Sequence, residues 1–409
     1  MQRVLDTILK KSTPTSSEHR KDKKIIEHVV STLTKNLSAQ NQSAQVMVGG
    51  SFAKQTYLKN DKDVDLFIRF PLGTNNISEL AKRACAPFKP KTIHGSRDYF
   101  LFTHKALHFE VIPVFNITHP DHAQNIMDAS PLHVAYVTKH LKNVDDVRLF
   151  KALCKAHHVY GAESYISGIS GYVLELLVIY YGSFTSALRH IANWGEDAFV
   201  DPAKHYSGKE PAKRALSKSK HSPLILIDPT QKTRNAASAL SKRNFNYLKK
   251  ISRAFLDNPS KKLFEDALTL PLLRAQAKKE NHFFVSKNLR ITGKKDIYLA
   301  KLHRALRKLN KKLELLDFTI LALGFIPDTN YVRVYAVFPS RFIPLIKRVI
   351  GPPKHMKKHA NLFVKRWAGK SIRGPYSYGG HVCVDVERTL SDAKEAFFVF
   401  LLDALERFS

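Results

Sequence analysis

Two aspartates stand at alternate positions at the start of a mainly apolar run, Asp63-Val64-Asp65 and onward to Phe70. The run from Val64 to Phe70 predicts a β-strand, and side chains two positions apart on a strand lie on the same face. Asp63 and Asp65 should therefore present two carboxylates on one face, about 7 Å apart. Such a pair can hold hard cations together with a triphosphate, which is the arrangement that phosphoryl transfer needs.

A glycine-serine element precedes this pair. Gly50 and Ser51 are followed by eleven residues and then by Asp63. Glycine lets the backbone come close to a phosphate, and the amide and hydroxyl of Ser51 can bind phosphate oxygens. A third carboxylate, Glu110, lies inside an apolar segment, where a charge is costly unless it has a partner or a metal ion. Together these residues predict a metal site that joins Glu110 to Asp63 and Asp65.

The aspartates have two other interpretations. An EF-hand loop starting at Asp61 would need glycine at its sixth position and glutamate at its twelfth. Leu66 and Leu72 stand there, so this interpretation fails. A solvated strand face is the second interpretation, and the spacing alone does not decide against it. The glycine-serine element and the third carboxylate favour the metal site.

The periodicity of the chain changes several times, which predicts an α+β fold: a head with a small mixed β-sheet, a helical neck, and an α+β body and tail. Either Ser16 or Ser17 could cap a helix of the head. Strands are expected at 46–48, 64–70, 99–103, 107–115, 224–227 and 381–386, with 99–115 as a hairpin. Helical segments are expected at 2–10, 131–195, 234–256, 299–316 and 393–408.

The charge balance indicates a polyanionic partner. Lysine and arginine number 66 against 35 acidic residues, which gives a formal net charge of +31. Nucleic acid is the usual reason for such an excess, and a solubility adaptation is the alternative. The three cysteines, Cys85, Cys154 and Cys383, are far apart, which argues against a disulfide framework and a zinc site. No signal peptide or membrane span is expected, so the predicted location is cytoplasmic.

These motifs resemble the archaeal-type (class I) CCA-adding enzymes of the nucleotidyltransferase superfamily. The Gly-Ser and Asp-x-Asp elements are similar to the superfamily signature, which many polymerases share. Further segments narrow the resemblance because they keep their order along nearly the whole chain. They are Arg148–Lys151 with Tyr160–Glu163, Gly168–Tyr172, Asp228-Pro229 with Arg234-Asn235, and Arg373–Gly380.

The resemblance implies a role for individual residues. Asp63, Asp65 and Glu110 stand where the family holds its catalytic, magnesium-binding carboxylates. The residues expected to bind the nucleotide are Gly50, Ser51, Lys54, Ser130, His133, Lys151, Tyr160 and Arg234. Within this set, Lys54 matches a triphosphate contact, and Arg234 matches an arginine that defines the incoming base together with RNA phosphates.

The implied activity is template-independent addition or repair of the 3′-terminal CCA of tRNA, from CTP and ATP, with release of pyrophosphate and Mg²⁺ as cofactor. The implied RNA contact is the acceptor stem and T-arm, and a homodimer is left open as the assembly. Basic residues expected to bind the RNA are Arg304, Lys354, Lys357, Lys358, Lys365, Arg366, Lys370 and Arg373. The expected domains are a head at 1–140, a base-binding neck at 141–260, a body at 261–300 and 373–409, and a basic tail at 301–372.

Two positions depart from the family pattern. Glu110 stands where much of the family has aspartate, and its longer side chain puts the metal geometry in question. Lys54 stands where arginine is common, which keeps the charge but loses the bidentate fork. Two rival functions stay open: another template-independent polymerase that makes poly(A) or oligoadenylate, and an inactive RNA-binding protein with a transferase-like head.

Overall fold

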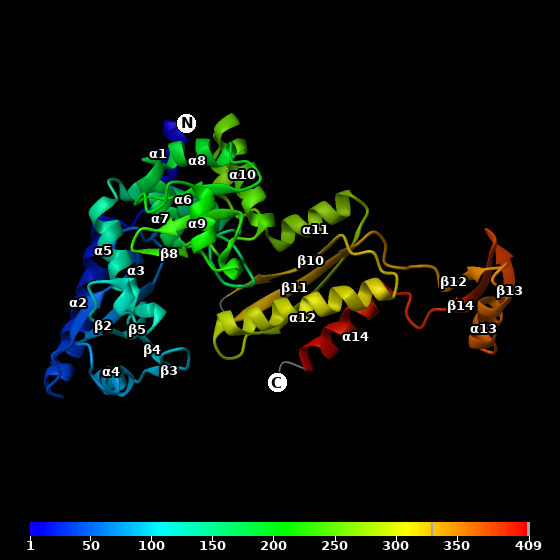
Figure 1. The fold of residues 1–409 in the computed structure, drawn as a ribbon, viewed down its shortest axis with the longest axis horizontal. Coiled ribbons are helices and arrows are strands. Elements are labelled where there is room, and N and C mark those ends of the chain that lie inside the picture. Colours follow the sequence, from blue (N-terminus) through cyan, green and yellow to red (C-terminus); the bar gives the residue numbers. More distant parts are fainter. Residues whose placement is uncertain (329, 407–409) are drawn as a thin grey trace. The chain divides into compact units, whose positions relative to one another are not determined.

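The computed structural model describes residues 1–328 and 330–406, and the chain divides into two compact units, Met1–Ala267 and Leu268–Ser409 (Figure 1). Each unit contains its own sheets and helices. The first unit holds the head and the neck, and the second holds the body and the tail. The fold is α+β, as the changes in periodicity predict.

A mixed, five-stranded sheet in the order β1-β2-β5-β4-β3 forms the centre of the head. Its neighbours β2 and β5 are parallel, and all other neighbouring strands are antiparallel. The strands span Gln45–Val48 (β1), Asp63–Phe70 (β2), Lys91–Ile93 (β3), Tyr99–His104 (β4) and Leu107–Phe115 (β5). The predicted hairpin of β4 and β5 is confirmed, and β3 extends the sheet beyond it.

The two faces of this sheet pack against different helices. Alternate residues of β2, including Val64 and Leu66, enter a core with the apolar side of α2 and with α4. Phe67 points to the opposite face and packs with Val134 of α5. Asp65 shares the face of Phe67 because the two are separated by two positions. The helices span Gln2–Ser12 (α1), Ser16–Ser38 (α2), Gly50–Ala53 (α3), Ile77–Cys85 (α4) and Ser130–His140 (α5), with short 3₁₀ turns at Ala86–Phe88, Pro120–His122 and Ile126–Ala129.

The N-cap of α2 is Thr15, one residue before the first of the two expected caps, Ser16 and Ser17. The helix begins at Ser16, so Thr15 occupies the cap position and accepts a hydrogen bond from the Glu18 backbone N–H. The Glu18 carboxylate accepts in return from the Thr15 backbone N–H at 2.8 Å. This reciprocal pair explains why neither Ser16 nor Ser17 is the cap, since only Thr15 has an acidic residue three positions later.

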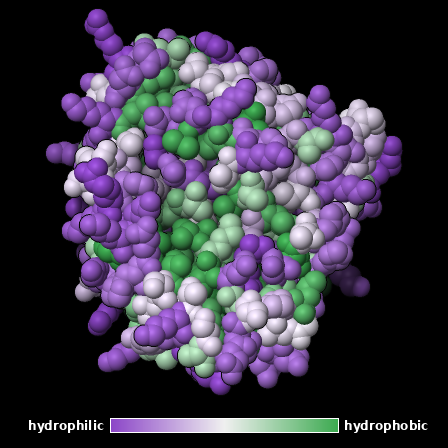
Figure 2. Space-filling view, turned by 90° about the vertical axis from the view of Figure 1, so that its left-hand side faces the viewer, coloured by the Kyte–Doolittle hydropathy of each residue, from purple (hydrophilic) through white to green (hydrophobic). Residues whose placement is uncertain are grey.

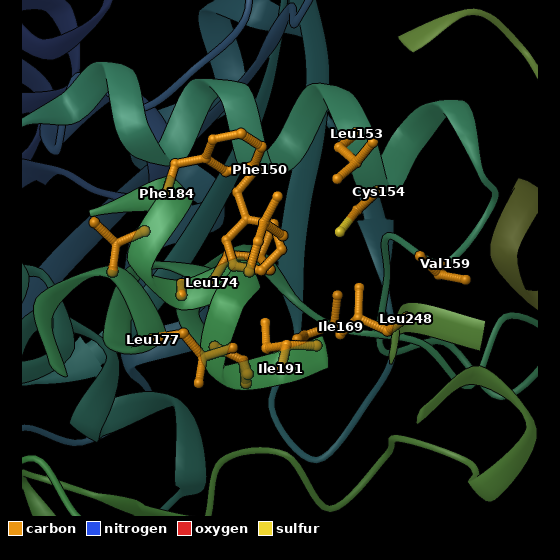
Figure 3. Close-up of a cluster of buried hydrophobic side chains, with 14 of the residues drawn as sticks. Phe150, Leu153, Cys154, Val159, Ile169, Leu174, Leu177, Phe184, Ile191 and Leu248 are labelled. Atoms are coloured by element: carbon orange, nitrogen blue, oxygen red, sulfur yellow. The ribbon is translucent and has the colours of Figure 1, made fainter. Parts of the chain in front are cut away.

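The neck is built from helices around one apolar core. Phe150, Leu174 and Phe184 are fully buried, and Figure 3 shows them converging with side chains from several helices. A small sheet in the order β6-β7-β8 lies beside them. The elements span Val144–Ala156 (α6), Gly171–Tyr181 (α7), Phe184–Ala192 (α8), Ala198–Val200 (β6), Lys209–Ala215 (α9), Lys218–Lys220 (3₁₀), Leu224–Asp228 (β7), Gln231–Asn235 (β8), Lys242–Asp257 (α10) and Lys261–Phe264 (3₁₀).

Two expectations for the neck are wrong. The stretch 131–195 is not helical throughout, because residues 157–170 between α6 and α7 lie outside the helices and Tyr160 pairs with Ile169 in a β-bridge. The helix predicted to begin at Arg234 begins at Lys242, because residues 231–235 pair with β7 as the second strand of a tight hairpin.

No single described helix is long and apolar enough to cross a membrane; α7 and α8 pass that test only together, with a bend of 94°. On the face of the molecule drawn in Figure 2, hydrophobic residues gather centrally and hydrophilic ones cover the rim.

The second unit contains two three-stranded sheets, β10-β11-β9 and β12-β14-β13. Helices α12 and α14 pack against each other beside the first sheet, and α13 packs on the second. The elements span Leu270–Lys279 (α11), Phe283–Arg290 (β9), Lys295–Leu315 (α12), Ala322–Pro327 (β10), Tyr331–Phe338 (β11), Ile346–Pro353 (β12), Lys357–Trp367 (α13), Arg373–Tyr378 (β13), His381–Glu387 (β14) and Ala393–Glu406 (α14). The expected extension of the last helix through 407–408 lies outside the described residues.

The grouping within this unit differs from the expected boundaries of body and tail. A boundary at residue 301 falls inside α12, and one at 373 falls at the start of β13, which pairs with β14. Helix α12 has an apolar side as well as its basic residues, and Leu302 and Leu309 on that apolar side are fully buried. That side packs with α14 and β10, so α12 groups with the body elements and 346–387 form the second sheet with its helix.

Candidate functional site

The three acidic residues lie on one face of the head sheet. β2 and β5 are parallel and in register, with Asp63 opposite His108 and Asp65 opposite Glu110. Paired residues of neighbouring strands point to the same face, so Glu110 lies beside Asp65. Among residues 1–328 and 330–406, no group of three or more His, Cys, Asp or Glu side chains has the arrangement of a metal site. The three-carboxylate metal site therefore stays a prediction that rests on strand register.

The glycine pair at the start of α3 lies directly against Asp65. The Gly49 backbone N–H donates to the Asp65 carbonyl oxygen at 2.8 Å. Gly50 has φ +55°, and a Cβ placed on it would lie 1.7 Å from Asp65 Oδ2. Only glycine fits here, both in conformation and in space. Burial raises the pKa of the Asp65 carboxyl, with Asp63 adding to the rise and Lys54 opposing it, so its charged form needs a cation nearby.

A buried chain of polar groups lies behind the turn. Lys54 Nζ lies 2.5 Å from Glu175 Oε2, and the Thr56 hydroxyl donates to Glu175 Oε1 at 2.7 Å. Lys151 Nζ donates to the Thr56 carbonyl at 2.9 Å and to Thr56 Oγ1 at 3.2 Å. Burial lowers the pKa of the Lys151 ammonium to about 8, although Glu175 opposes the change. Both of these hydrogen bonds of the Lys151 ammonium go to Thr56, and the residue is only 1% exposed.

The Tyr160 hydroxyl lies near Lys151 at the start of α7. Burial raises the pKa of the Tyr160 phenol well above its usual range, so the group stays protonated. A Cβ at Gly171 would lie 2.9 Å from the Tyr160 hydroxyl and 3.7 Å from Lys151 Nζ. The first residue of α7 thus leaves room for both side chains, which lie close to each other.

A second cluster centres on the buried carboxylate of Asp228. Arg234 forms an ion pair with Asp228 Oδ2, and Tyr172 donates to Oδ1 at 3.1 Å. His133 Nε2 lies 3.1 Å from Oδ2 without hydrogen-bond alignment, and its ring stacks on Tyr172. Burial favours the neutral carboxyl, but His133, Arg234 and the Thr230 backbone N–H outweigh it and hold the pKa of Asp228 far below its usual range.

The beginning of α5 is fixed by a third buried carboxylate. Asp128 is fully buried, accepts from the backbone N–H groups of Phe115, Gln124 and Asn125, and forms an ion pair with Arg97. These contacts set where Ser130 begins α5 and hence where His133 lies one turn later. Asp128 is thus a structural residue, while Ser130 is half-buried at the helix start.

The structure brings most of the expected nucleotide-binding residues into two neighbouring clusters. Lys54 connects them, because its ammonium pairs with Glu175 and also lies 5.9 Å from the centre of the Tyr172 ring. Sequence reasoning gave no role to Thr56, Tyr172, Glu175 or Asp228. Glu175 had a usable signal, since it is an acidic residue within the apolar run of α7.

The expected RNA-binding residues lie in the second unit, and all eight are exposed. Most of them belong to α13 and its flanks, while Arg304 lies on α12. The second sheet adds Arg348, whose guanidinium lies 4.0 Å from the centre of the Tyr378 ring and donates to the Tyr376 hydroxyl at 2.8 Å.

Three family models match consecutive parts of the chain: a nucleotidyltransferase domain at 30–133, the second domain of tRNA nucleotidyltransferase at 145–265, and the C-terminal domain of CCA-adding enzyme at 293–400. The CCA-adding enzyme of Nanoarchaeum equitans is 34% identical over 371 residues, which cover 86% of this chain and 88% of that protein. The CCA-adding enzyme of Methanosarcina barkeri is 28% identical, with 95% of this chain and 86% of that protein covered.

Solved structures show a likeness of fold. A structure of Cid1, described by its RNA terminal uridylyl transferase activity, has a TM-score of 0.52 at 14% identity and covers 66% of this chain and 100% of its own. A cytoplasmic RNA terminal U-transferase has a TM-score of 0.51 at 14% identity, with 66% of this chain and 99% of that one covered. At this identity the likeness concerns the fold alone.

Proposed function

The chain belongs to the family of CCA-adding enzymes, and from this membership we propose how its own residues serve the family reaction. The protein is a tRNA nucleotidyltransferase that adds CCA to the 3′ end of tRNA without a template, from CTP and ATP. A bond forms between the RNA 3′-oxygen and the α-phosphorus, and the bond from that phosphorus to pyrophosphate breaks.

Asp63, Asp65 and Glu110 would hold the divalent cation, and we propose that this ion is Mg²⁺. All three offer the oxygen ligands that hard cations prefer, and all lie on one sheet face. Burial raises the pKa of the Asp65 carboxyl, and a bound cation would favour its charged form. When bound, a divalent ion supplies positive charge to the attacking and leaving oxygens.

The chain itself would position the triphosphate and the base. The turn at Gly50 and Ser51 faces the carboxylates and can direct backbone N–H groups to phosphate oxygens. Lys54 supplies a positive charge on the same side. Arg234, which Asp228 orients, has further N–H donors for the edge of an incoming base.

We propose that the exposed lysines and arginines around α13 bind the acceptor stem and T-arm through their phosphates. An A-form helix has a deep, narrow major groove that side chains cannot read, so shape and backbone charge would guide this contact. The proposed location is the cytoplasm. The oligomeric state is open to measurement by sedimentation in the presence and absence of tRNA.

The in-register pairing of Asp65 with Glu110, beside a turn that only glycine fits, carries the catalytic proposal. The test is Asp65→Ala with labelled CTP and a tRNA that lacks CCA. We expect incorporation to fall by about 1,000-fold or more, because charge stabilisation at the reacting phosphate disappears. Asp121→Ala is the control, since Asp121 is an exposed acid with no place in the cluster. Full incorporation by Asp65→Ala would reject the catalytic assignment.

A further inference from the structure

One buried carboxylate of the neck holds both ends of a three-residue head segment. Glu175 is fully buried on α7 and contacts Lys54 through one oxygen and Thr56 through the other. These contacts span 121 and 119 residues of sequence. The segment 54–56 directly follows α3 and therefore the glycine-serine turn. The position of the turn is thus linked to the neck through a single side chain.

The same segment contains a strained residue that the neck keeps in place. Gln55 has φ +57°, in the left-handed region that costs a non-glycine residue on the order of 1 kcal/mol. Its carbonyl accepts from Arg148 at 2.7 Å, and the Thr56 carbonyl accepts from Lys151 at 2.9 Å. Both donors lie on α6. Contacts from two neck helices therefore fix a turn that would relax without them.

The hydroxyl of Thr56 connects the two lysines. It donates its proton to Glu175 Oε1 and accepts from Lys151 Nζ, while Glu175 Oε2 accepts from Lys54. Every member is at least nine-tenths buried, so each contact is shielded from water. With two ammonium groups and one carboxylate, the cluster keeps an excess of positive charge directly after the glycine-serine turn.

We propose that Glu175 is a positioning residue for the incoming nucleotide. Glu175 holds the Lys54 ammonium directly and holds the segment 54–56 through the Thr56 hydroxyl, in the position where both bind the triphosphate of CTP or ATP. Lys151 supports the same segment by donating to the Thr56 carbonyl. This inference rests on the proposed function, because it assigns Lys54 to the triphosphate.

A double-mutant cycle of Glu175→Gln and Lys54→Met tests the proposal. Glutamine keeps the size of the side chain but removes the charge that pairs with Lys54. We expect Glu175→Gln to raise the KM for CTP and for ATP by about 10- to 100-fold, the scale of a misplaced binding group, with the Kd for tRNA unchanged. The double variant should lose less than the two single losses combined, because part of the effect of Glu175 passes through Lys54 and the rest through Thr56.

Thr56 provides the matched pair of variants. Thr56→Val removes the hydroxyl and should raise the nucleotide KM, whereas Thr56→Ser keeps it and should restore the wild-type value. Additive losses in the cycle, or a lowered melting temperature with an unchanged KM, would overturn the positioning role. If the wild-type protein did not add CCA to tRNA, the proposed function would be rejected. This result is distinct from the results that would overturn the positioning role of Glu175.

Discussion

At the scale of single residues, the site depends on two groups that tolerate almost no change. Gly50 combines a left-handed backbone with a side-chain position already filled by Asp65. Asp228 is a buried anion that pairs with Arg234 and lies 3.1 Å from His133 Nε2. Gly50 lets the backbone approach the Asp65 carboxylate, and Asp228 supplies the negative charge beside Arg234, so substitutions at the two positions should have different consequences.

Gly50→Ala should abolish most CCA addition. The added Cβ would displace the Asp65 carboxylate, and φ +55° adds a strain of about 1 kcal/mol. Gly73→Ala is the matched control, because Gly73 also has a positive φ but has nothing within 4 Å of its Cβ position. Incorporation of labelled CTP and thermal unfolding measure both effects. Equal activity in the two variants would show that the contact with Asp65 is unimportant.

Asp228→Asn should destabilise the protein near neutral pH by on the order of 3 kcal/mol, since it leaves His133 and Arg234 beside an uncharged group. The pKa of Asp228 is held below its unfolded value of about 3.9, so its contribution is complete above that pH. The contribution is lost as pH falls toward the folded pKa. Denaturant unfolding of wild type and variant from pH 7 to pH 3 should therefore show a gap that narrows below about pH 4. A constant gap would contradict this account.

At the scale of elements, α7 connects the two halves of the site. Its first residue leaves space for Tyr160, its second binds Asp228, and Glu175 one turn later holds the head. The helix itself is almost wholly apolar and buried in the neck core. The polar positions are therefore fixed by a rigid support, which suits side chains that must hold their places.

The cap of α2 offers a test of local sequence–structure assignment. Thr15→Ala should lower the free energy of unfolding by about 1 kcal/mol, because it removes the acceptor for the Glu18 N–H. Ser17→Ala, at a position that the sequence also nominates, should change it by less than about 0.5 kcal/mol. Denaturant titration of both variants measures the difference, and CCA addition should stay unchanged in each. A larger loss in Ser17→Ala would mean that α2 is capped differently in solution.

At the scale of the whole molecule, local patterns account for the strands and the acidic face, and long-range contacts account for what was missed. Alternation placed Asp63 and Asp65 on one face, and β4 and β5 formed the expected hairpin. The partners of Lys54 and Arg234 could not be predicted in the same way. Glu175 is 121 residues from Lys54, and the hairpin that presents Arg234 has a register shift that periodicity does not reveal.

The expected boundary between body and tail falls inside α12 for a related physical reason. The charged side of α12 resembles a nucleic-acid-binding surface, while its buried leucines connect it to α14 almost a hundred residues later. Basic charge alone therefore does not define a domain. Basic charge does determine where added salt should weaken RNA binding, and the basic residues of α13 are exposed.

Salt dependence separates phosphate binding by α13 from the general effect of a net charge of +31. Lys357→Gln with Lys358→Gln should lower the slope of log Kd for tRNA against log salt by about 2, one for each phosphate that the variant no longer neutralises. The matched pair is Lys23→Gln with Lys24→Gln, adjacent exposed lysines on α2 of the head. This second pair removes the same charge and should leave the slope unchanged. If both pairs lowered the slope equally, the tail would hold tRNA only through the overall field of the protein, and the proposed contact at α13 would be wrong.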